Sequence, residues 1–249
     1  VGDIELFARE ATGRIVGITG TNGKSTVTTL VGEIAESAGL DVRVGGNIGR
    51  PALELLAGEP AELYVLELSS YQLETTRSLG LAAATVLNLS PDHMDRYADL
   101  AEYGAAKARI FDQCALAVVN LDDPIASRMA RPGQATAGFS LVDEAAEYAL
   151  RELAGAQWLV GRGEPLLPLR DLRIAGLHNA ANALAAVALA DAVGIPRAAS
   201  VAALEHFPGL PHRAQVVAEA GGVRYVDDSK ATNVGAALTT LAGLPGPLI

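Results

Sequence analysis

The segment from Gly17 to Ser25 reads GITGTNGKS, and no other part of the chain is better suited to binding phosphate. Its three glycines lack a Cβ, which lets the backbone approach an anion closely and adopt positive φ angles. An apolar run precedes the segment and a helical pattern follows it, so free amide groups and the positive end of a helix would face the anion. Lys24 can then reach the β- and γ-phosphates, and the Ser25 hydroxyl can ligate Mg2+. The segment predicts binding of ATP with Mg2+.

The spacing of these glycines is irregular. A phosphate loop usually has four residues between its first glycine and the Gly-Lys pair, but Ile18 stands at that first place and Gly17 lies one residue earlier. A glycine-rich turn with a purely structural role is therefore the alternative. The strand-like run before the segment and the helical pattern after it favour the nucleotide-binding hypothesis.

Two later segments add groups suited to metal chemistry. Glu67 lies near the end of the apolar run LYVLEL, where a charge is costly unless it is paired or bound to a metal. We expect it to ligate Mg2+ directly or through water, with a solvent-exposed carboxylate as the alternative. His93 lies among Asn88 and Asp92 after the next apolar run, which favours a functional role over a solvated turn. The spacing of Lys107 indicates only a surface lysine.

Composition limits the classes of partner. The chain has 249 residues, of which 50% are hydrophobic, and a formal net charge of −10. An acidic protein of this kind is a poor match for nucleic acid or an anionic membrane surface, and no apolar run reaches the length of about 20 residues that a bilayer requires. The single cysteine, Cys114, is compatible with a reducing compartment, so we expect a cytoplasmic protein.

The order of apolar runs and helical patterns predicts an α/β fold. Short apolar runs alternate with helices, which is typical of a mostly parallel sheet covered by helices on both faces. Residues 135–175 favour a small antiparallel section, and residues 1–13 show no convincing element. The predicted strands are 14–19, 41–44, 63–68, 83–89 and 116–121, and the predicted helices are 24–38, 51–56, 100–111, 177–193 and 197–206. After a Pro- and Gly-rich boundary at 207–213, we expect a hairpin (214–219 and 223–226) and a helix (233–241).

Several segments together resemble one family, the Mur ligases, which form amide bonds with ATP in the synthesis of peptidoglycan precursors. The resemblance rests on GTNGKS (20–25), GNIG (46–49), ELSSYQLE (67–74), Asn88 with DHMDRY (92–97), HNAAN (178–182), LPHR (210–213) and DDSKATN (227–233). GKS is generic, whereas ELSSYQLE and DHMDRY are specific and look like the branch that adds D-glutamate to UDP-N-acetylmuramoyl-L-alanine.

The resemblance implies a mechanism. ATP would phosphorylate the carboxylate of the nucleotide-linked substrate, and the amine of D-glutamate would attack the resulting acyl phosphate. Phosphorylation supplies the leaving group that a carboxylate lacks, and cations would neutralise the transferred phosphoryl group. A ligase of the same family with another amino acid or with folate as substrate, and a nucleotide-binding module without catalysis, remain the alternatives.

The resemblance also assigns roles to individual residues. The nucleotide would be bound by Gly20, Thr21, Asn22, Gly23, Lys24, Ser25, Thr26, Asn179, Asn182, Arg213 and Asp228. Two Mg2+ ions would be held by Ser25, Glu67, His93 and Lys107, the last as a lysine carbamate; Lys24, His93 and Lys107 would be the catalytic residues. The muramoyl–alanine substrate would lie near Asn47, Ser69 and Gln72, and D-glutamate near Lys230 and Thr232.

The family has three domains, and the resemblance divides this chain accordingly. Residues 1–13 would be a linker or the remnant of an N-terminal UDP-binding domain, 14–210 the ATP-binding domain, and 211–249 the truncated start of a Rossmann-like C-terminal domain. We therefore expect a monomer that binds ATP but does not complete ligation alone. Its partners would be small-molecule substrates, not nucleic acid or membrane.

Overall fold

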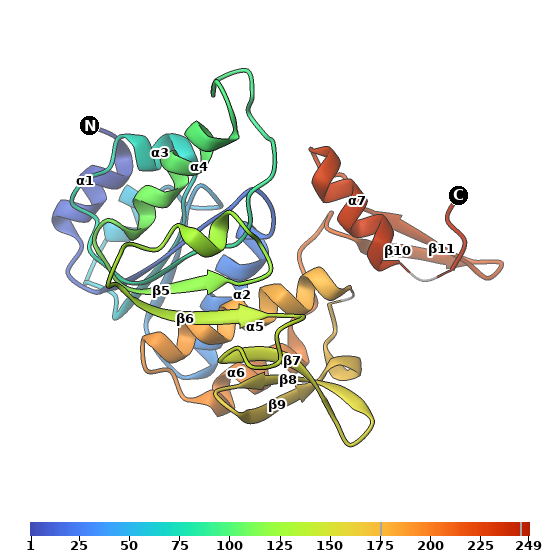
Figure 1. The fold of residues 1–249 in the computed structure, drawn as a ribbon. Coiled ribbons are helices and arrows are strands. Elements are labelled where there is room, and N and C mark those ends of the chain that lie inside the picture. The colour runs from blue at the N-terminus through green and yellow to red at the C-terminus, as the bar shows by residue number, and fades with distance from the viewer. Residues whose placement is uncertain (175, 245) are drawn as a thin grey trace.

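Nine strands form one sheet in the order β2-β3-β1-β4-β5-β6-β7-β8-β9 (Figure 1). The computed structural model describes residues 1–174, 176–244 and 246–249. The strands are β1 (Arg14–Thr19), β2 (Val42–Gly46), β3 (Leu63–Glu67), β4 (Leu81–Val86), β5 (Cys114–Asn120), β6 (Ala135–Ser140), β7 (Tyr148–Leu153), β8 (Ala156–Gly161) and β9 (Glu164–Pro168). Neighbours from β2 to β7 are parallel, whereas β8 runs antiparallel to both β7 and β9. This confirms the mostly parallel sheet with a small antiparallel section.

Helices cover both faces of the sheet, as the sequence predicted. They are α1 (Asp3–Glu10), α2 (Lys24–Ser37), α3 (Ser70–Glu74), α4 (Leu100–Ala108), α5 (Leu177–Ala192) and α6 (Arg197–His206), with 3-10 turns η1 (Ala52–Leu56), η2 (Arg109–Phe111), η3 (Ala126–Arg128) and η4 (Leu169–Asp171). One apolar core lies under α2, α5 and α6, and a second under α1, α3 and α4. Strand β3 contributes side chains to both cores, because Leu63 and Val65 face the first core while Tyr64 and Leu66 face the second.

The register of the central strands brings their carboxyl ends together. Ile18 of β1 pairs with Glu67 of β3, and Thr19 pairs with Val86 of β4. Loops that follow parallel strands in such a sheet gather at one edge, where ligands bind. The loop after β1 is therefore placed between the residues that follow β3 and β4.

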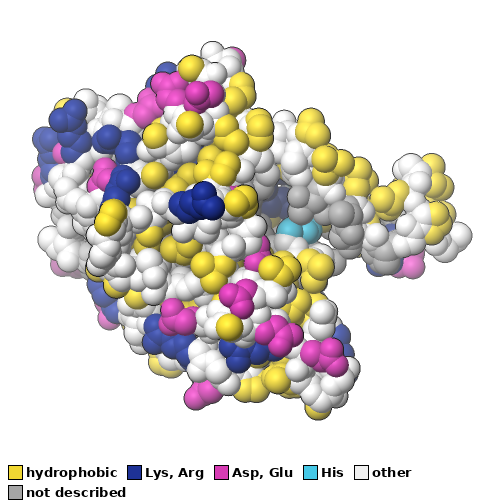
Figure 2. All heavy atoms as spheres, viewed as in Figure 1, with side chains coloured by type: hydrophobic (Ala, Val, Ile, Leu, Met, Phe, Trp, Pro, Cys, Tyr) yellow, Lys and Arg dark blue, Asp and Glu magenta, His cyan; other side chains and the backbone are white. Residues whose placement is uncertain are grey.

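The carboxyl-terminal part forms a separate small sheet. Strands β10 (Gln215–Ala220) and β11 (Val223–Asp227) pair as a hairpin, and α7 (Val234–Gly243) follows, which confirms the predicted hairpin and helix. Figure 1 shows this part, in red, projecting from the main body, and Figure 2 shows apolar side chains on its surface. Whether it begins a Rossmann-like domain, and where the domain boundaries fall, stay predictions. None of the helices in the described ranges has the length and apolar character needed to cross a membrane.

The amino-terminal segment departs from the prediction. Residues 1–13 were expected to lack an element of their own, but α1 occupies Asp3–Glu10 and its Ile4 and Phe7 side chains are fully buried. The ring of Phe7 packs edge-on against Tyr64 with centroids 5.2 Å apart. Eight residues make only about two helical turns, so the apolar pattern is too short to indicate a helix from sequence alone.

A buried carboxylate fixes α1 to the main body. Glu5 accepts hydrogen bonds from the backbone amides of Arg77 and Ser78 at 2.8 and 3.0 Å, and from the Ser78 hydroxyl at 2.9 Å. The Arg9 guanidinium adds an ion pair at 2.9 Å. The Arg77 amide and the other donors lower the pKa of Glu5 from 4.5 to about 2.

Replacing Glu5 by Gln should lower the melting temperature in a pH-dependent way. Because the folded-state pKa is depressed, the stabilisation by the ionised carboxylate is complete above about pH 4.5 and is lost as the pH falls toward 2. Thermal unfolding of wild type and Glu5→Gln from pH 7 down to pH 2 should give curves that converge at the acid end. A difference in melting temperature that does not change with pH would contradict this assignment.

Candidate nucleotide and metal site

The loop from Gly20 to Gly23 joins β1 to α2. Gly20 and Gly23 have φ angles of +148° and +84°, and a Cβ at Gly23 would lie 2.6 Å from Oδ1 of Asn182. Gly17, in contrast, lies inside β1, where a Cβ would lie 2.9 Å from a methyl group of Leu81. The expectation that Gly17 lets the loop approach phosphate is therefore wrong: this glycine makes room for the core, and its position accounts for the irregular spacing.

Asn88, in the segment after β4, holds the tip of this loop. Its side chain accepts a hydrogen bond from the Asn22 amide at 2.8 Å and donates to the Asn22 carbonyl at 3.0 Å. The amide of Thr21 donates to the Asn88 carbonyl at 3.0 Å, and the Ser90 amide donates to Oγ1 of Thr21 at 3.1 Å. These bonds fix the backbone of the loop without using a ligand. Sequence reasoning placed Asn88 near the site but did not identify this role.

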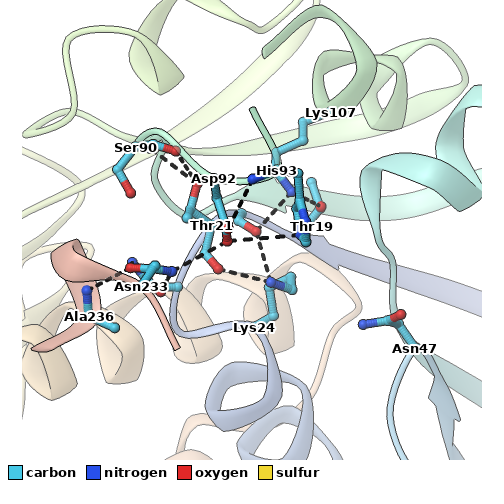
Figure 3. A network of polar contacts seen from close by, with 12 residues as sticks. Thr19, Thr21, Lys24, Asn47, Ser90, Asp92, His93, Lys107, Asn233 and Ala236 are labelled. Atoms are coloured by element: carbon cyan, nitrogen blue, oxygen red, sulfur yellow. Dashed lines mark hydrogen bonds and ion pairs between the residues drawn. The ribbon is translucent and has the colours of Figure 1, made fainter. Parts of the chain in front are cut away.

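Two lysines, the half-buried Lys24 and the buried Lys107, lie at the base of the loop, as Figure 3 shows. Lys24 donates to the carbonyls of Gly20 and Thr21 at 3.0 and 2.9 Å. Lys107, from α4, donates to the Gly20 carbonyl at 2.9 Å and is 1% exposed. Spacing alone indicated a surface position for Lys107, and this prediction is therefore wrong. The residue spacing within a helix does not show that Lys107 will contact Thr19 and Gly20 at the end of β1.

Burial changes the protonation of both amines. Desolvation lowers the pKa of Lys24, while the charges of Glu67 and Asp92 raise it. Desolvation, followed by the positive charge of Lys24, lowers the pKa of Lys107 from 10.5 to about 7. The Lys107 amine is therefore available in its neutral form near physiological pH.

Glu67, at the end of β3, has the properties of a cation ligand. It is 3% exposed, and its Oε1 accepts a hydrogen bond from Nδ2 of Asn47 at 2.8 Å. Its Oε2 is buried without a hydrogen-bond partner among the described residues. A buried anionic oxygen of this kind requires a partner, so the residue fits a divalent cation. The second proposed ligand, the Ser25 hydroxyl, accepts a hydrogen bond from Arg213 at 2.9 Å.

His93 lies at the rim of the site with a φ angle of +57°. Its ring lies between those of Tyr71 and Tyr103, with centroids 5.2 and 6.2 Å away, and its Nε2 is 3.9 Å from Oδ2 of Asp92. Within the described ranges no three His, Cys, Asp or Glu side chains form a metal cluster. Magnesium here would therefore need hydroxyl, phosphate or carbamate oxygens in addition to the carboxylates.

A cavity of about 370 Å³ opens beside the loop, within the usual size range of small-molecule sites. It brings together residues that the resemblance assigned to the nucleotide and that lie far apart in the sequence: Asn22, Gly23, Thr26, Asn179, Asn182, Arg213 and Asp228, together with Lys230. Asn182 donates to Oδ1 of Asn179 at 3.1 Å. The lining also includes Asn120, Asp123 and His178, which sequence reasoning did not assign; the first two lie at the end of β5 and just after it, at the same edge of the sheet.

Four of the five residues expected to contact substrate lie outside this cavity, among them Asn47, which bonds to Glu67. Ser69 and Gln72 form a capping box at the start of α3, and Gln72 also donates to Asp3 at 3.3 Å. Thr232 is exposed and does not line the cavity. Their proposed substrate contacts therefore depend on surfaces other than the cavity wall.

The comparisons with known proteins agree with this geometry. The family model described as "Mur ligase middle domain" matches residues 18–190. The UDP-N-acetylmuramoylalanine–D-glutamate ligase of Methylococcus capsulatus is 55% identical over the whole chain, which covers 54% of that protein. The protein of the same name from Sodalis glossinidius is 57% identical over 98% of the chain, which covers 55% of it.

A solved structure extends the similarity to the fold. The pseudomurein peptide ligase type C of Methanothermus fervidus superposes with a TM-score of 0.80 over 99% of this chain and 59% of its own, at 18% identity. At that identity the likeness concerns the fold alone. The chain spans about half the length of the curated relatives it matches. With the family model covering most of the sheet and the phosphate loop, this chain belongs to the Mur ligase family.

Proposed function

We propose that this chain is the ATP-binding core of a ligase that adds D-glutamate to UDP-N-acetylmuramoyl-L-alanine and converts ATP to ADP and phosphate. The printed names of relatives at 55 and 57% identity support the choice of substrates. The proposal concerns the whole ligase, because this chain spans about half of their length. The ligase would act as a monomer in the cytoplasm in peptidoglycan precursor synthesis.

The observation that carries the proposal is Oε2 of Glu67, which is buried without a hydrogen-bond partner in the part of the chain that the structure describes and lies close to Lys24. Phosphoryl transfer requires positive charge around the transferred group and little covalent chemistry from the protein. Lys24 and the loop amides would hold the β- and γ-phosphates. One Mg2+ ion would be held by Ser25 and Glu67, and a second by His93 and a carbamate on Lys107. Together they would neutralise the phosphate charge.

The remaining residues would orient the substrates. The base and ribose would enter the cavity beside Asn179 and Asn182, with Arg213 and Asp228 closing over them. Asn47, Ser69 and Gln72 would face the muramoyl–alanine carboxylate, and Lys230 and Thr232 the incoming D-glutamate. The substrate carboxylate oxygen attacks the γ-phosphorus and ADP leaves. The D-glutamate amine then attacks the acyl phosphate, loses a proton and expels phosphate.

Phosphate release tests this function directly. The full-length protein that contains this chain should release phosphate from ATP only when both UDP-N-acetylmuramoyl-L-alanine and D-glutamate are present. L-alanine, L-glutamate and diaminopimelate should not replace D-glutamate. Release stimulated by one of these instead would assign the chain to another ligase of the family, and nucleotide binding without any release would indicate a binding module.

Replacing Glu67 by Gln should weaken Mg2+-dependent nucleotide binding. The variant keeps an oxygen for Asn47 but removes the negative charge, so calorimetry on this chain should show ADP affinity reduced about 10- to 100-fold in the presence of Mg2+, the range expected for a lost charged contact. Affinity measured in EDTA should be unchanged. The exposed Glu59→Gln is the matched control. Equal losses with and without Mg2+ would show that Glu67 does not act through the metal.

Lys107 should carry a carbamate above neutral pH. Only the neutral amine reacts with CO2, and a pKa of about 7 makes it abundant, while the neighbouring Lys24 charge favours the anionic product. The chain equilibrated with 13C-bicarbonate should show a carbamate carbonyl signal that increases between pH 6 and 8, that Lys107→Arg removes and that Lys24→Arg retains. A signal that follows Lys24, or none at all, would refute the assignment.

A further inference from the structure

The first turn of α7 lies against the tip of the phosphate loop. Nδ2 of Asn233 donates hydrogen bonds to Oδ1 of Asn22 at 3.0 Å and to Oδ2 of Asp92 at 3.3 Å. In return, Nδ2 of Asn22 donates to Oδ1 of Asn233 at 3.5 Å. Figure 3 shows Asn233 pointing from its helix toward the loop. The two amides, 211 residues apart in the sequence, thus form a reciprocal pair.

The same asparagine also starts the helix. Oδ1 of Asn233 accepts a hydrogen bond from the Ala236 amide at 2.8 Å, which is an N-cap. At Gly235 a Cβ would lie 3.3 Å from Oγ of Ser90 and 3.7 Å from Nδ2 of Asn22, so this glycine lets the helix approach the loop closely. One side chain therefore both sets the beginning of α7 and joins it to the main body.

The partner on the loop is itself fixed. The backbone of Asn22 is held on both sides by Asn88, at 2.8 and 3.0 Å. A second contact between the two parts is made by Arg213, whose Nη2 donates to Oγ of Ser25 at 2.9 Å. Between these contacts, all residues of β10 are exposed, whereas Val226 and Asp227 at the end of β11 are half-buried, so β10 contributes little to the attachment.

The connection that precedes the hairpin has an unusual backbone conformation. Gly209, His212 and Ala214 have φ angles of +82°, +64° and +47°, and two of these three residues carry a side chain that disfavours this conformation. The connection is hydrogen-bonded to the end of the hairpin, because the Ala214 amide donates to Oδ1 of Asp228 at 3.0 Å and the Lys230 amide donates to the His212 carbonyl at 3.2 Å. The Arg213 contact lies next to the connection, so contacts farther along the segment are needed to fix rotation about it; Asn233 provides one, and α7 also lies against α5.

We propose that Asn233 is a positioning residue whose amide pair with Asn22 sets the orientation of residues 211–249 over the phosphate loop. This orientation places Lys230 and Asp228 at the wall of the cavity. Because the pair joins the loop to the segment, nucleotide bound at the loop and this orientation of the segment would stabilise each other reciprocally. The coupling to nucleotide rests on the proposed function; the pairing does not.

Asn233→Asp separates the two roles of this residue. Aspartate is as good an N-cap as asparagine, so α7 is retained, but the carboxylate cannot donate to Asn22 and is repelled by Asp92. Gln215→Glu is the matched control, since it adds the same charge to the same segment and keeps the oxygen that accepts from the His212 amide. Hydrogen exchange at the Ala236 amide verifies that the cap persists.

Spin labels at Val142→Cys in the main body and Glu219→Cys in the hairpin, in a Cys114→Ser background, measure the orientation of residues 211–249 relative to the main body through the distance between the labels. We expect a narrow distribution for wild type and Gln215→Glu and a broad one for Asn233→Asp. Mg-ADP affinity should be about three- to tenfold weaker in Asn233→Asp, the effect of one or two lost neutral hydrogen bonds. A narrow distribution in Asn233→Asp, with the Ala236 amide protected, would overturn the proposal.

A double-mutant cycle adds a second criterion. Asn22→Ala should broaden the distribution as Asn233→Asp does, and the double variant should be no broader than either single one, since both remove the same pair. Additive broadening would overturn the pairing. If the chain binds no nucleotide, the proposed function fails, while the label distances without nucleotide still decide whether the pair orients the segment.

Discussion

The position of β1 between β3 and β4 is the constraint on which the site depends. Parallel pairing at this register makes the three strands end at the same edge of the sheet, so the phosphate loop emerges between Glu67 on one side and Asn88 on the other. A shift of one residue would turn Glu67 toward the opposite face of the sheet. The placement of the carboxylate, the loop and its anchoring asparagine thus follows from one set of backbone hydrogen bonds.

The charges gathered at this edge explain why the site is suited to an anionic ligand with metal ions. The half-buried Lys24 lies close enough to the buried Lys107 that its charge lowers the pKa of Lys107, and one carboxylate oxygen has no partner in the described structure. Burying such groups is costly. Phosphate oxygens would satisfy the cation on the loop, and a divalent ion would satisfy the carboxylate.

The two ends of the chain are attached by different forces. The amino-terminal helix α1 buries Ile4 and Phe7 and is fixed by the three donors of Arg77 and Ser78 that bond to Glu5. The carboxyl-terminal part reaches the loop through polar contacts of Arg213 and Asn233. A single hydrogen bond contributes little net stability, so this second attachment is weaker than the first, which also buries apolar side chains.

Local signals in the sequence were enough to predict the class of fold, the glycine-rich loop between β1 and α2, and the location of Glu67 and His93 at the same edge of the sheet, because short apolar runs, helical spacing and polar groups at strand ends need no distant partner. Features that depend on contacts between distant segments came from the tertiary structure. Spacing within α4 could not show that Lys107 is buried against β1, nor could the pattern of residues 1–13 reveal a helix whose stability comes from packing. The glycine spacing suggested that Gly17 belongs to the loop, but in the structure Leu81 and Ile110 fill the space beside it. The pairing of Asn22 with Asn233 likewise depends on the tertiary structure. The two residues are 211 positions apart, and no local sequence pattern predicts a hydrogen bond over that separation.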